Sequence, residues 1–128
     1  MPFRTRKLSE EETVKLREIV QVVEGTILTR GANLDLEISC GGAADLMSDV
    51  LALMTPGCLL LTGLITLQAI RTAEIADLAA IVFVRGKTPG PQEIALAEEL
   101  GVPLITSSRT MFELCGRLYR AGMVSVEI

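Results

Sequence analysis

Hydroxyl-bearing and cationic residues gather in three short turns of this sequence. The turns contain Thr62 and Gly63, then Arg85, Gly86, Lys87 and Thr88, and finally Ser107, Ser108, Arg109 and Thr110. Each turn follows a short apolar run and precedes a segment with helical character. Backbone N–H groups at a helix amino terminus lack helical partners and attract anions. The three turns therefore suit a small anionic ligand, such as a nucleotide or another phosphate compound. The alternative is that the hydroxyls only cap helices and the cations are solvated.

The run Gly86-Lys87-Thr88 matches the end of the phosphate-binding loop found in many kinases. That loop needs a further glycine five residues before the Gly-Lys pair and must lead directly into a helix. Here the earlier position is Ile81, within an apolar run, and Pro89-Gly90-Pro91 follows Thr88. The sequence also contains no histidine, so no triad or histidine-based metal site can be assembled. We therefore predict a non-catalytic protein without cofactor or metal.

Asp45 and Asp49 are the paired carboxylates most suited to chemistry. At a spacing of four they would share one face of a helix predicted over residues 43–54, where they could hold Mg²⁺ or transfer protons. No third carboxylate lies nearby in the sequence. The alternative, which we favour, is a solvated face whose negative charge suits the first helical turn.

Three apolar runs precede the three turns, at residues 58–61, 79–84 and 102–105. Runs of Val, Ile and Leu without polar alternation are typical of strands buried on both faces of a parallel sheet. The intervening segments are long enough for helical crossovers. The sequence therefore predicts one three-layer α/β domain with a mostly parallel sheet covered by helices. Ligands of such sheets usually bind outside the carboxyl ends of the strands.

Capping signals and hydrophobic spacing predict the remaining elements. Ser9 with Glu12, and Thr110 with Glu113, form capping boxes at the start of two helices. Gly41-Gly42 is interpreted as a break in regular structure. The predicted helices span residues 9–23, 43–54, 64–76, 91–100 and 110–121, and the predicted shorter strands span residues 26–29, 34–39 and 124–128.

Composition narrows the functional classes. A chain of 128 residues predicts a single domain, with residues 1–7 flexible, and a net charge of −4 argues against a nucleic-acid partner. No apolar run approaches the roughly 20 residues of a membrane span, so we expect a cytoplasmic protein. The cysteines are odd in number and fit no CxxC spacing, which favours buried, reduced thiols for Cys40, Cys58 and Cys115.

The apolar share of the sequence favours self-association. Apolar residues make up 49% of the chain and aromatic residues only 3%, so a monomer would leave much aliphatic surface wet. The alternating segments 34–39 and 124–128 read as edge strands with few of the defences that prevent pairing. We therefore predict a homodimer whose contact buries Leu34, Leu36, Val124 and Val126.

Four strings of the sequence occur together in a known family. They are DLMSDVL at 45–51, LLLTG at 59–63, ALAEELGVPLI at 95–105 and TMFE at 110–113. With their order and spacing, residues 20–118 resemble the DRTGG domain family, whose members are similar to the amino-terminal domain of HPr kinase/phosphorylase and also occur beside nucleotide-binding CBS domains. The resemblance implies an α/β fold and no established catalytic activity. It also implies either a regulatory role, with a ligand and a partner protein, or an interaction and assembly role without a ligand.

The residues that name the family are largely replaced. Val84-Arg85-Gly86 stands where Thr-Gly-Gly would follow the central strand, and no Asp-Arg pair follows Thr62-Gly63, although Pro89 is retained. The sequence thus resembles a divergent, stand-alone member, in which a link to a serine kinase system is the less favoured alternative.

Overall fold

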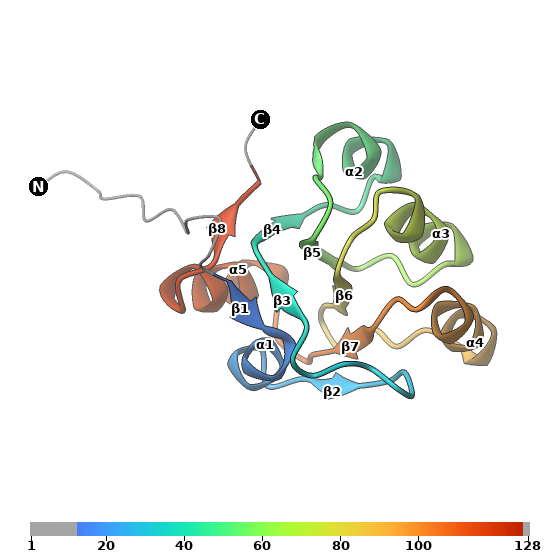
Figure 1. Cartoon of the computed structure of the whole chain (residues 1–128), viewed down its shortest axis with the longest axis horizontal. Helices are drawn as coiled ribbons and strands as arrows, with labels where there is room; N and C mark the ends of the chain where they lie inside the picture. Colours follow the sequence, from blue (N-terminus) through green and yellow to red (C-terminus); the bar gives the residue numbers. More distant parts are fainter. Residues whose placement is uncertain (1–12, 127–128) are drawn as a thin grey trace, which may run out of the picture.

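The structure, a computed structural model, describes residues 13–126, which form eight strands and five helices (Figure 1). The strands are β1 (Val14–Lys15), β2 (Thr26–Ile27), β3 (Glu37–Ile38), β4 (Cys40–Ala43), β5 (Cys58–Thr62), β6 (Ala80–Phe83), β7 (Leu104–Thr106) and β8 (Val124–Ser125). The helices are α1 (Leu16–Val22), α2 (Met47–Leu53), α3 (Leu67–Ile75), α4 (Pro91–Leu100) and α5 (Met111–Arg120).

Six strands form one sheet in the order β2-β7-β6-β5-β4-β8. Every neighbouring pair from β8 to β7 is parallel, and only β2 joins antiparallel, beside β7. The three apolar runs of the sequence are β5, β6 and β7, and β6 lies inside the sheet rather than at its edge. The predicted mostly parallel α/β fold is therefore confirmed. A separate antiparallel pair joins β1 to β3.

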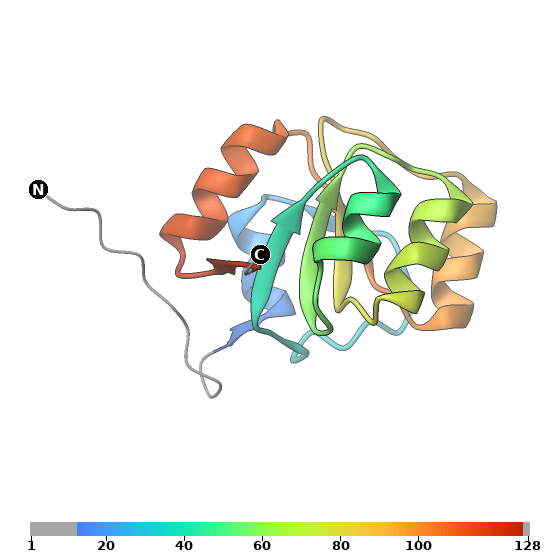
Figure 2. The same cartoon turned by 90° about the horizontal axis from the view of Figure 1, so that it is seen from above.

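Helices cover both faces of the sheet, as Figure 2 shows: α2, α3 and α4 lie on one face and α1 and α5 on the other. In β5, Leu59 and Leu61 point into the core shared with α1 and α5, whereas Cys58 and Leu60 point into the core under α2, α3 and α4. Alternate residues thus enter different cores. This explains why the run is continuously apolar instead of alternating.

Strand β4 contains the Gly41-Gly42 pair, so the predicted break at these glycines is wrong. A Cβ atom added to Gly41 would lie 2.9 Å from Sδ of Met123, and one added to Gly42 would collide with Sδ of Met54. Met123 and Met54 thus pack against the backbone of this strand from opposite faces of the sheet. The strand needs glycines because it has no room for side chains.

Cys40 and Cys58 are directly paired residues of the parallel strands β4 and β5. Their Cα atoms are 4.6 Å apart, and their sulfur atoms are joined as a disulfide. Cys115 is a free cysteine on the exposed side of α5. The prediction of three buried, reduced thiols is therefore wrong, because sequence spacing did not reveal which strands are neighbours.

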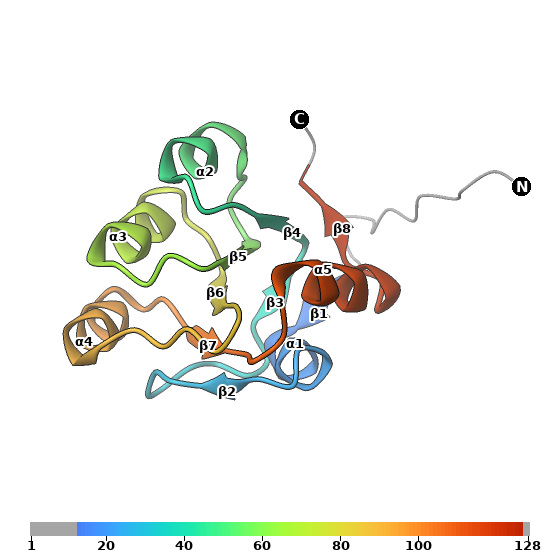
Figure 3. The same cartoon turned by 180° about the vertical axis from the view of Figure 1, so that it is seen from behind.

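Several predicted boundaries also differ. Residues 34–35 are turn and Leu36 is irregular, and within the predicted segment 34–39 only Glu37–Ile38 is a strand, which pairs with β1. Helix α1 begins at Leu16, later than predicted, because the chain is still extended at Val14. Residues 1–7 and the predicted capping box of Ser9 and Glu12 lie outside the described residues. Figure 3 shows α1 and α5 side by side on their face of the sheet.

The ends of the later helices agree with the capping signals. Pro91 opens α4, and Gly101 ends it in the left-handed conformation with φ of 74°. Thr110 caps α5, since its hydroxyl accepts a hydrogen bond from the N–H of Glu113. Strand β8 lies at the edge of the sheet beyond β4, as predicted for an edge strand in this part of the sequence.

Candidate functional site

The loops that follow β5, β6 and β7 meet at one edge of the sheet, because the three strands are parallel and adjacent. Backbone hydrogen bonds hold two of these loops together. The N–H of Arg85 donates to the carbonyl of Arg109, and the N–H of Gly86 donates to the carbonyl of Ser107, both at 2.8 Å. The three turns identified in the sequence therefore lie at the carboxyl ends of neighbouring strands. The prediction that they form one site depends on this arrangement.

The end of β5 contacts a carboxylate that the predicted ligand set did not include. Oδ1 of Asp45 accepts hydrogen bonds from the hydroxyl of Thr62 at 3.0 Å and from the N–H of Gly63 at 2.7 Å. Asp45 precedes α2, which begins only at Met47, so it does not share a helical face with Asp49 as predicted. Thr62 itself is fully buried and also accepts from the N–H of Leu64.

Arg85 extends from the next loop across the end of β5. A Cβ atom added to Gly63 would lie 2.9 Å from Nη2 of Arg85 and 3.6 Å from Oδ1 of Asp45. The guanidinium and the carboxylate thus both lie close to Gly63. Arg85 has a φ of 58°. This left-handed conformation is unusual for a residue with a side chain and occurs preferentially at functional positions.

The rest of the loop after β6 is held through its backbone. The carbonyl of Lys87 accepts a hydrogen bond of 2.8 Å from the hydroxyl of Thr106, and the hydroxyl of Thr88 donates to the carbonyl of Gly86. These contacts leave the side chain of Lys87 exposed. Within residues 13–126, neither Lys87 nor Arg85 forms an ion pair.

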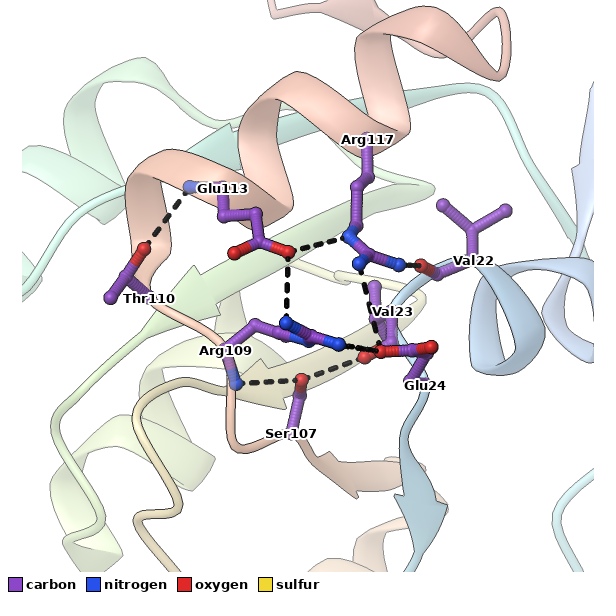
Figure 4. Close-up of polar contacts among 8 residues, drawn as sticks. All are labelled: Val22, Val23, Glu24, Ser107, Arg109, Thr110, Glu113 and Arg117. Atoms are coloured by element: carbon purple, nitrogen blue, oxygen red, sulfur yellow. Dashed lines mark hydrogen bonds and ion pairs between the residues drawn. The ribbon is translucent and has the colours of Figure 1, made fainter.

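The predicted residues after β7 have a different role, which Figure 4 shows. Arg109 donates from Nε and Nη2 to Oε1 of Glu24, at 2.9 and 2.6 Å, and its Nη1 lies 3.4 Å from Oε2 of Glu113. Arg117 contacts both of these glutamates, at 3.6 Å from Glu24 and 2.9 Å from Glu113. We call these four residues the Glu24–Arg109 cluster. It joins the end of α1 to α5.

The cluster also shifts the ionisation of its members. The hydrogen bond from Arg109 is the main reason that the pKa of Glu24 is lowered, and the charges of Arg109 and Arg117 add to the effect. In return, the hydrogen bond to Glu24 raises the pKa of Arg109, with a further contribution from the charge of Glu113. Arg109 is thus already paired with carboxylates and is not a free cation at the sheet edge.

Ser107 and Thr110 are likewise engaged in contacts within the chain. The hydroxyl of Ser107 donates to the carbonyl of Val23 at 2.7 Å and accepts from the N–H of Arg109. The hydroxyl of Thr110 caps α5, and Ser108 is exposed. The alternative interpretation of the sequence is that the hydroxyls only cap helices and the cations are solvated. Thr110 caps a helix, whereas the hydroxyl of Ser107 binds a backbone carbonyl and Arg109 is paired with glutamates.

We group the residues at the ends of β4, β5 and β6 as the carboxyl-end site: Asp45, Thr62, Gly63, Arg85 and Lys87. Its two cations are able to bind an anion, and the guanidinium of Arg85 offers paired donors that match a phosphate or carboxylate. Residues 13–126 contain no group of three or more carboxylate or cysteine ligands that could hold a metal ion. None of the helices in that range is long and apolar enough to cross a membrane.

A sequence profile of the DRTGG domain matches residues 18–121, most of the chain. The chain belongs to the DRTGG domain family. No protein of curated function matches it in sequence. In this DRTGG domain Arg85 lies two residues after the end of β6, in the run Val84-Arg85-Gly86.

A solved structure confirms the fold of this DRTGG domain. It contains the CBS and DRTGG domains of the regulatory region of Clostridium perfringens pyrophosphatase, complexed with the activator diadenosine tetraphosphate. The match has a TM-score of 0.70 and 13% sequence identity, and it covers 86% of this chain and 48% of that chain. This DRTGG domain thus spans about half the length of that protein chain, and at this identity the likeness concerns the fold.

Proposed function

We propose that this DRTGG domain is a non-catalytic regulatory domain that binds a small anionic ligand, a nucleotide or another phosphate compound, and signals to a partner protein. The observation that carries the proposal is the pair of exposed cations, Arg85 and Lys87, on a loop whose backbone is held to the neighbouring loop. The regulatory region of the C. perfringens pyrophosphatase, which binds diadenosine tetraphosphate, supports this choice of ligand class.

The contrast with other cations strengthens the argument. Arg17 is paired with Asp35, and Arg109 and Arg117 are paired with Glu24 and Glu113. Arg71 also forms no ion pair within residues 13–126, but it lies within α3, so Arg85 and Lys87 differ from it by their position after a parallel strand. Arg85 and Lys87 lie at the carboxyl ends of the parallel strands and have no carboxylate within 4 Å among the described residues. Their positive charge is therefore available to a ligand, although the protein as a whole is acidic. Because the loop backbone is already held, binding of an anion has to order only the two side chains and not the loop as well.

A thermal-shift screen against diadenosine tetraphosphate, ATP, AMP and pyrophosphate tests the proposal. A ligand present at 100 times its dissociation constant adds about 2.7 kcal/mol, which raises the melting temperature by several degrees. Arg85→Ala and Lys87→Ala should each abolish most of that rise. Arg71→Ala is the matched control, because Arg71 is exposed on α3 and away from the sheet edge. Absence of any rise, or an equal loss in the control, would contradict the proposal.

The assembly of two copies is a second candidate function, which a different surface favours. Phe112, Cys115 and Tyr119 share the outer side of α5, with 91% of Phe112 and 52% of Tyr119 exposed. A groove of about 200 Å³ beside this stripe is lined by α5, β4 and the edge strand β8. Exposed apolar patches of this kind mark protein contacts, and a two-fold contact would close at a dimer. The predicted contact through Leu34 and Leu36 was expected to pair strands, but both residues lie in the irregular segment that precedes β3.

A further inference from the structure

Cys40 and Cys58 occupy facing positions on two hydrogen-bonded strands, so their sulfur atoms are brought together by the sheet itself. The Cα separation of 4.6 Å lies within the range that a disulfide spans without backbone movement. Both side chains belong to the core under α2 and α3. The sheet register alone thus places the two sulfurs within bonding reach, whatever the oxidation state.

The two cysteines differ in access. Cys58 is completely buried, whereas Cys40 is only partly buried. The hydroxyl of Thr55, in the turn before β5, lies 3.1 Å from Sγ of Cys58 and 3.6 Å from Sγ of Cys40. A hydroxyl at this position donates to a thiolate when the bond is open, and a hydrogen bond to the charged form favours that form.

We propose that Cys40 and Cys58 form a reversible thiol–disulfide pair, which a small disulfide such as glutathione disulfide oxidises. The accessible Cys40 thiolate attacks one sulfur of glutathione disulfide, forms a mixed disulfide and releases one glutathione thiolate. The Cys58 thiolate then attacks the sulfur of Cys40 and releases the second glutathione. Two protein thiols and one glutathione disulfide become one protein disulfide and two glutathiones, and the two thiol protons pass to the two leaving thiolates.

The Cys40–Cys58 disulfide closes a loop that contains Asp45 of the carboxyl-end site. The cysteines are 18 residues apart, and the chain between them holds the rest of β4, Asp45 and the whole of α2. Closing a loop of this size restricts the unfolded chain and so stabilises the fold. Asp45 contacts the end of β5 at Gly63, so oxidation tethers the segment that carries one side of the carboxyl-end site.

The test uses the full chain equilibrated in glutathione buffers of decreasing potential. Thiols are blocked with N-ethylmaleimide in urea after an acid quench and counted by intact mass. We expect one label, on Cys115, in the oxidised protein and three in the reduced protein. The oxidised form should melt about 5–10 °C higher, given the usual effect of a loop of this length.

Two variants separate this bond from other thiol chemistry. Cys115→Ser should give no label when oxidised and two when reduced, with the full difference in melting temperature. The double variant Cys40→Ser with Cys58→Ser should melt at the same temperature in all buffers. Three labels in wild type at every potential, or one label that persists after native treatment with excess dithiothreitol, would overturn the proposal. A melting temperature of Cys115→Ser that does not change with potential would do the same.

Discussion

Oδ1 of Asp45 accepts a hydrogen bond of 2.7 Å from the backbone N–H of Gly63. The contact joins the loop after β4 to the end of β5, and the hydroxyl of the buried Thr62 donates to the same oxygen. An anionic ligand that approaches this strand end therefore meets a carboxylate of the chain itself, and its favourable contacts have to come from Arg85 and Lys87.

Replacing Asp45 should lower the stability of the fold. Asp45→Ala leaves the buried hydroxyl of Thr62 and the N–H of Gly63 without their acceptor, which should cost about 1–3 kcal/mol in urea unfolding. Asp45→Asn should cost less, because the amide oxygen still accepts a hydrogen bond. Asp49→Ala is the control, since Asp49 is exposed on α2. Equal losses for Asp45→Ala and Asp49→Ala would show that the contact contributes little.

Substitutions at Arg85 should reveal the cost of its backbone conformation. At a φ of 58° glycine is favoured over alanine, so we expect Arg85→Gly to be more stable than Arg85→Ala by about 1 kcal/mol. Arg71 within α3 is the matched position with the opposite expectation, because glycine is worse than alanine in a helix by about 1 kcal/mol. Urea unfolding of the four variants measures both differences. The same order of stability at the two positions would contradict the prediction.

The Glu24–Arg109 cluster should make stability depend on acid pH. Since the folded pKa of Glu24 lies below its ordinary value of 4.5, its stabilising effect is present above pH 4.5 and is lost as the pH falls through the folded pKa. Glu24→Gln should therefore melt lower than wild type at pH 7 and lose less on acidification to pH 3. Glu74→Gln, at an exposed position of α3, should keep the wild-type pH profile. Parallel profiles for wild type and Glu24→Gln would refute the assignment.

We expect no phosphoryl transfer by this domain. Ile81 stands in β6 at the position of the required glycine, and α4 begins at Pro91, three residues after Thr88. Incubation with labelled ATP and candidate acceptor proteins should give no more product for wild type than for Lys87→Ala. Reproducible transfer by wild type that is lost in Lys87→Ala would establish a kinase.

The apolar side of α5 should mediate self-association. We expect a dimer mass in light scattering at micromolar concentration, and Phe112→Ser should shift the equilibrium toward monomer without loss of stability, because Phe112 packs little within its own chain. Ile75→Ser is the control, since Ile75 is 70% exposed on α3, on the opposite face of the sheet (Figure 2). Monomeric wild-type protein over this concentration range would exclude the contact.

The core strands could be predicted from the sequence because each buries both of its faces. Strands β5 and β6 appear as unbroken apolar runs for this reason. Strand β4 could not be predicted, because Gly41 and Gly42 have no side chains that could form an apolar pattern. The side chains of Met123 and Met54, which occupy the space beside these glycines, come from other parts of the sequence.

The carboxyl-end site was predicted in part. Parallel neighbouring strands end on the same side of a sheet, and this rule was enough to place Thr62, Gly63 and Arg85 together at the carboxyl ends of the strands. Asp45 was misplaced because its helix begins two residues later, at Met47. Arg109 and Glu24 are 85 residues apart in the sequence, so no local sequence pattern could predict that they pair.

The hydrogen bond from the N–H of Arg85 to the carbonyl of Arg109 has a consequence for communication within the protein. Arg109 immediately precedes Thr110, the cap of α5, and the first turn of α5 carries Phe112. A ligand that shifts the backbone at Arg85 would therefore also shift the start of the helix proposed to contact a second copy. Such coupling is reciprocal. If binding of an anion raises the affinity between two subunits by some factor, then association of the subunits raises the affinity for the anion by the same factor.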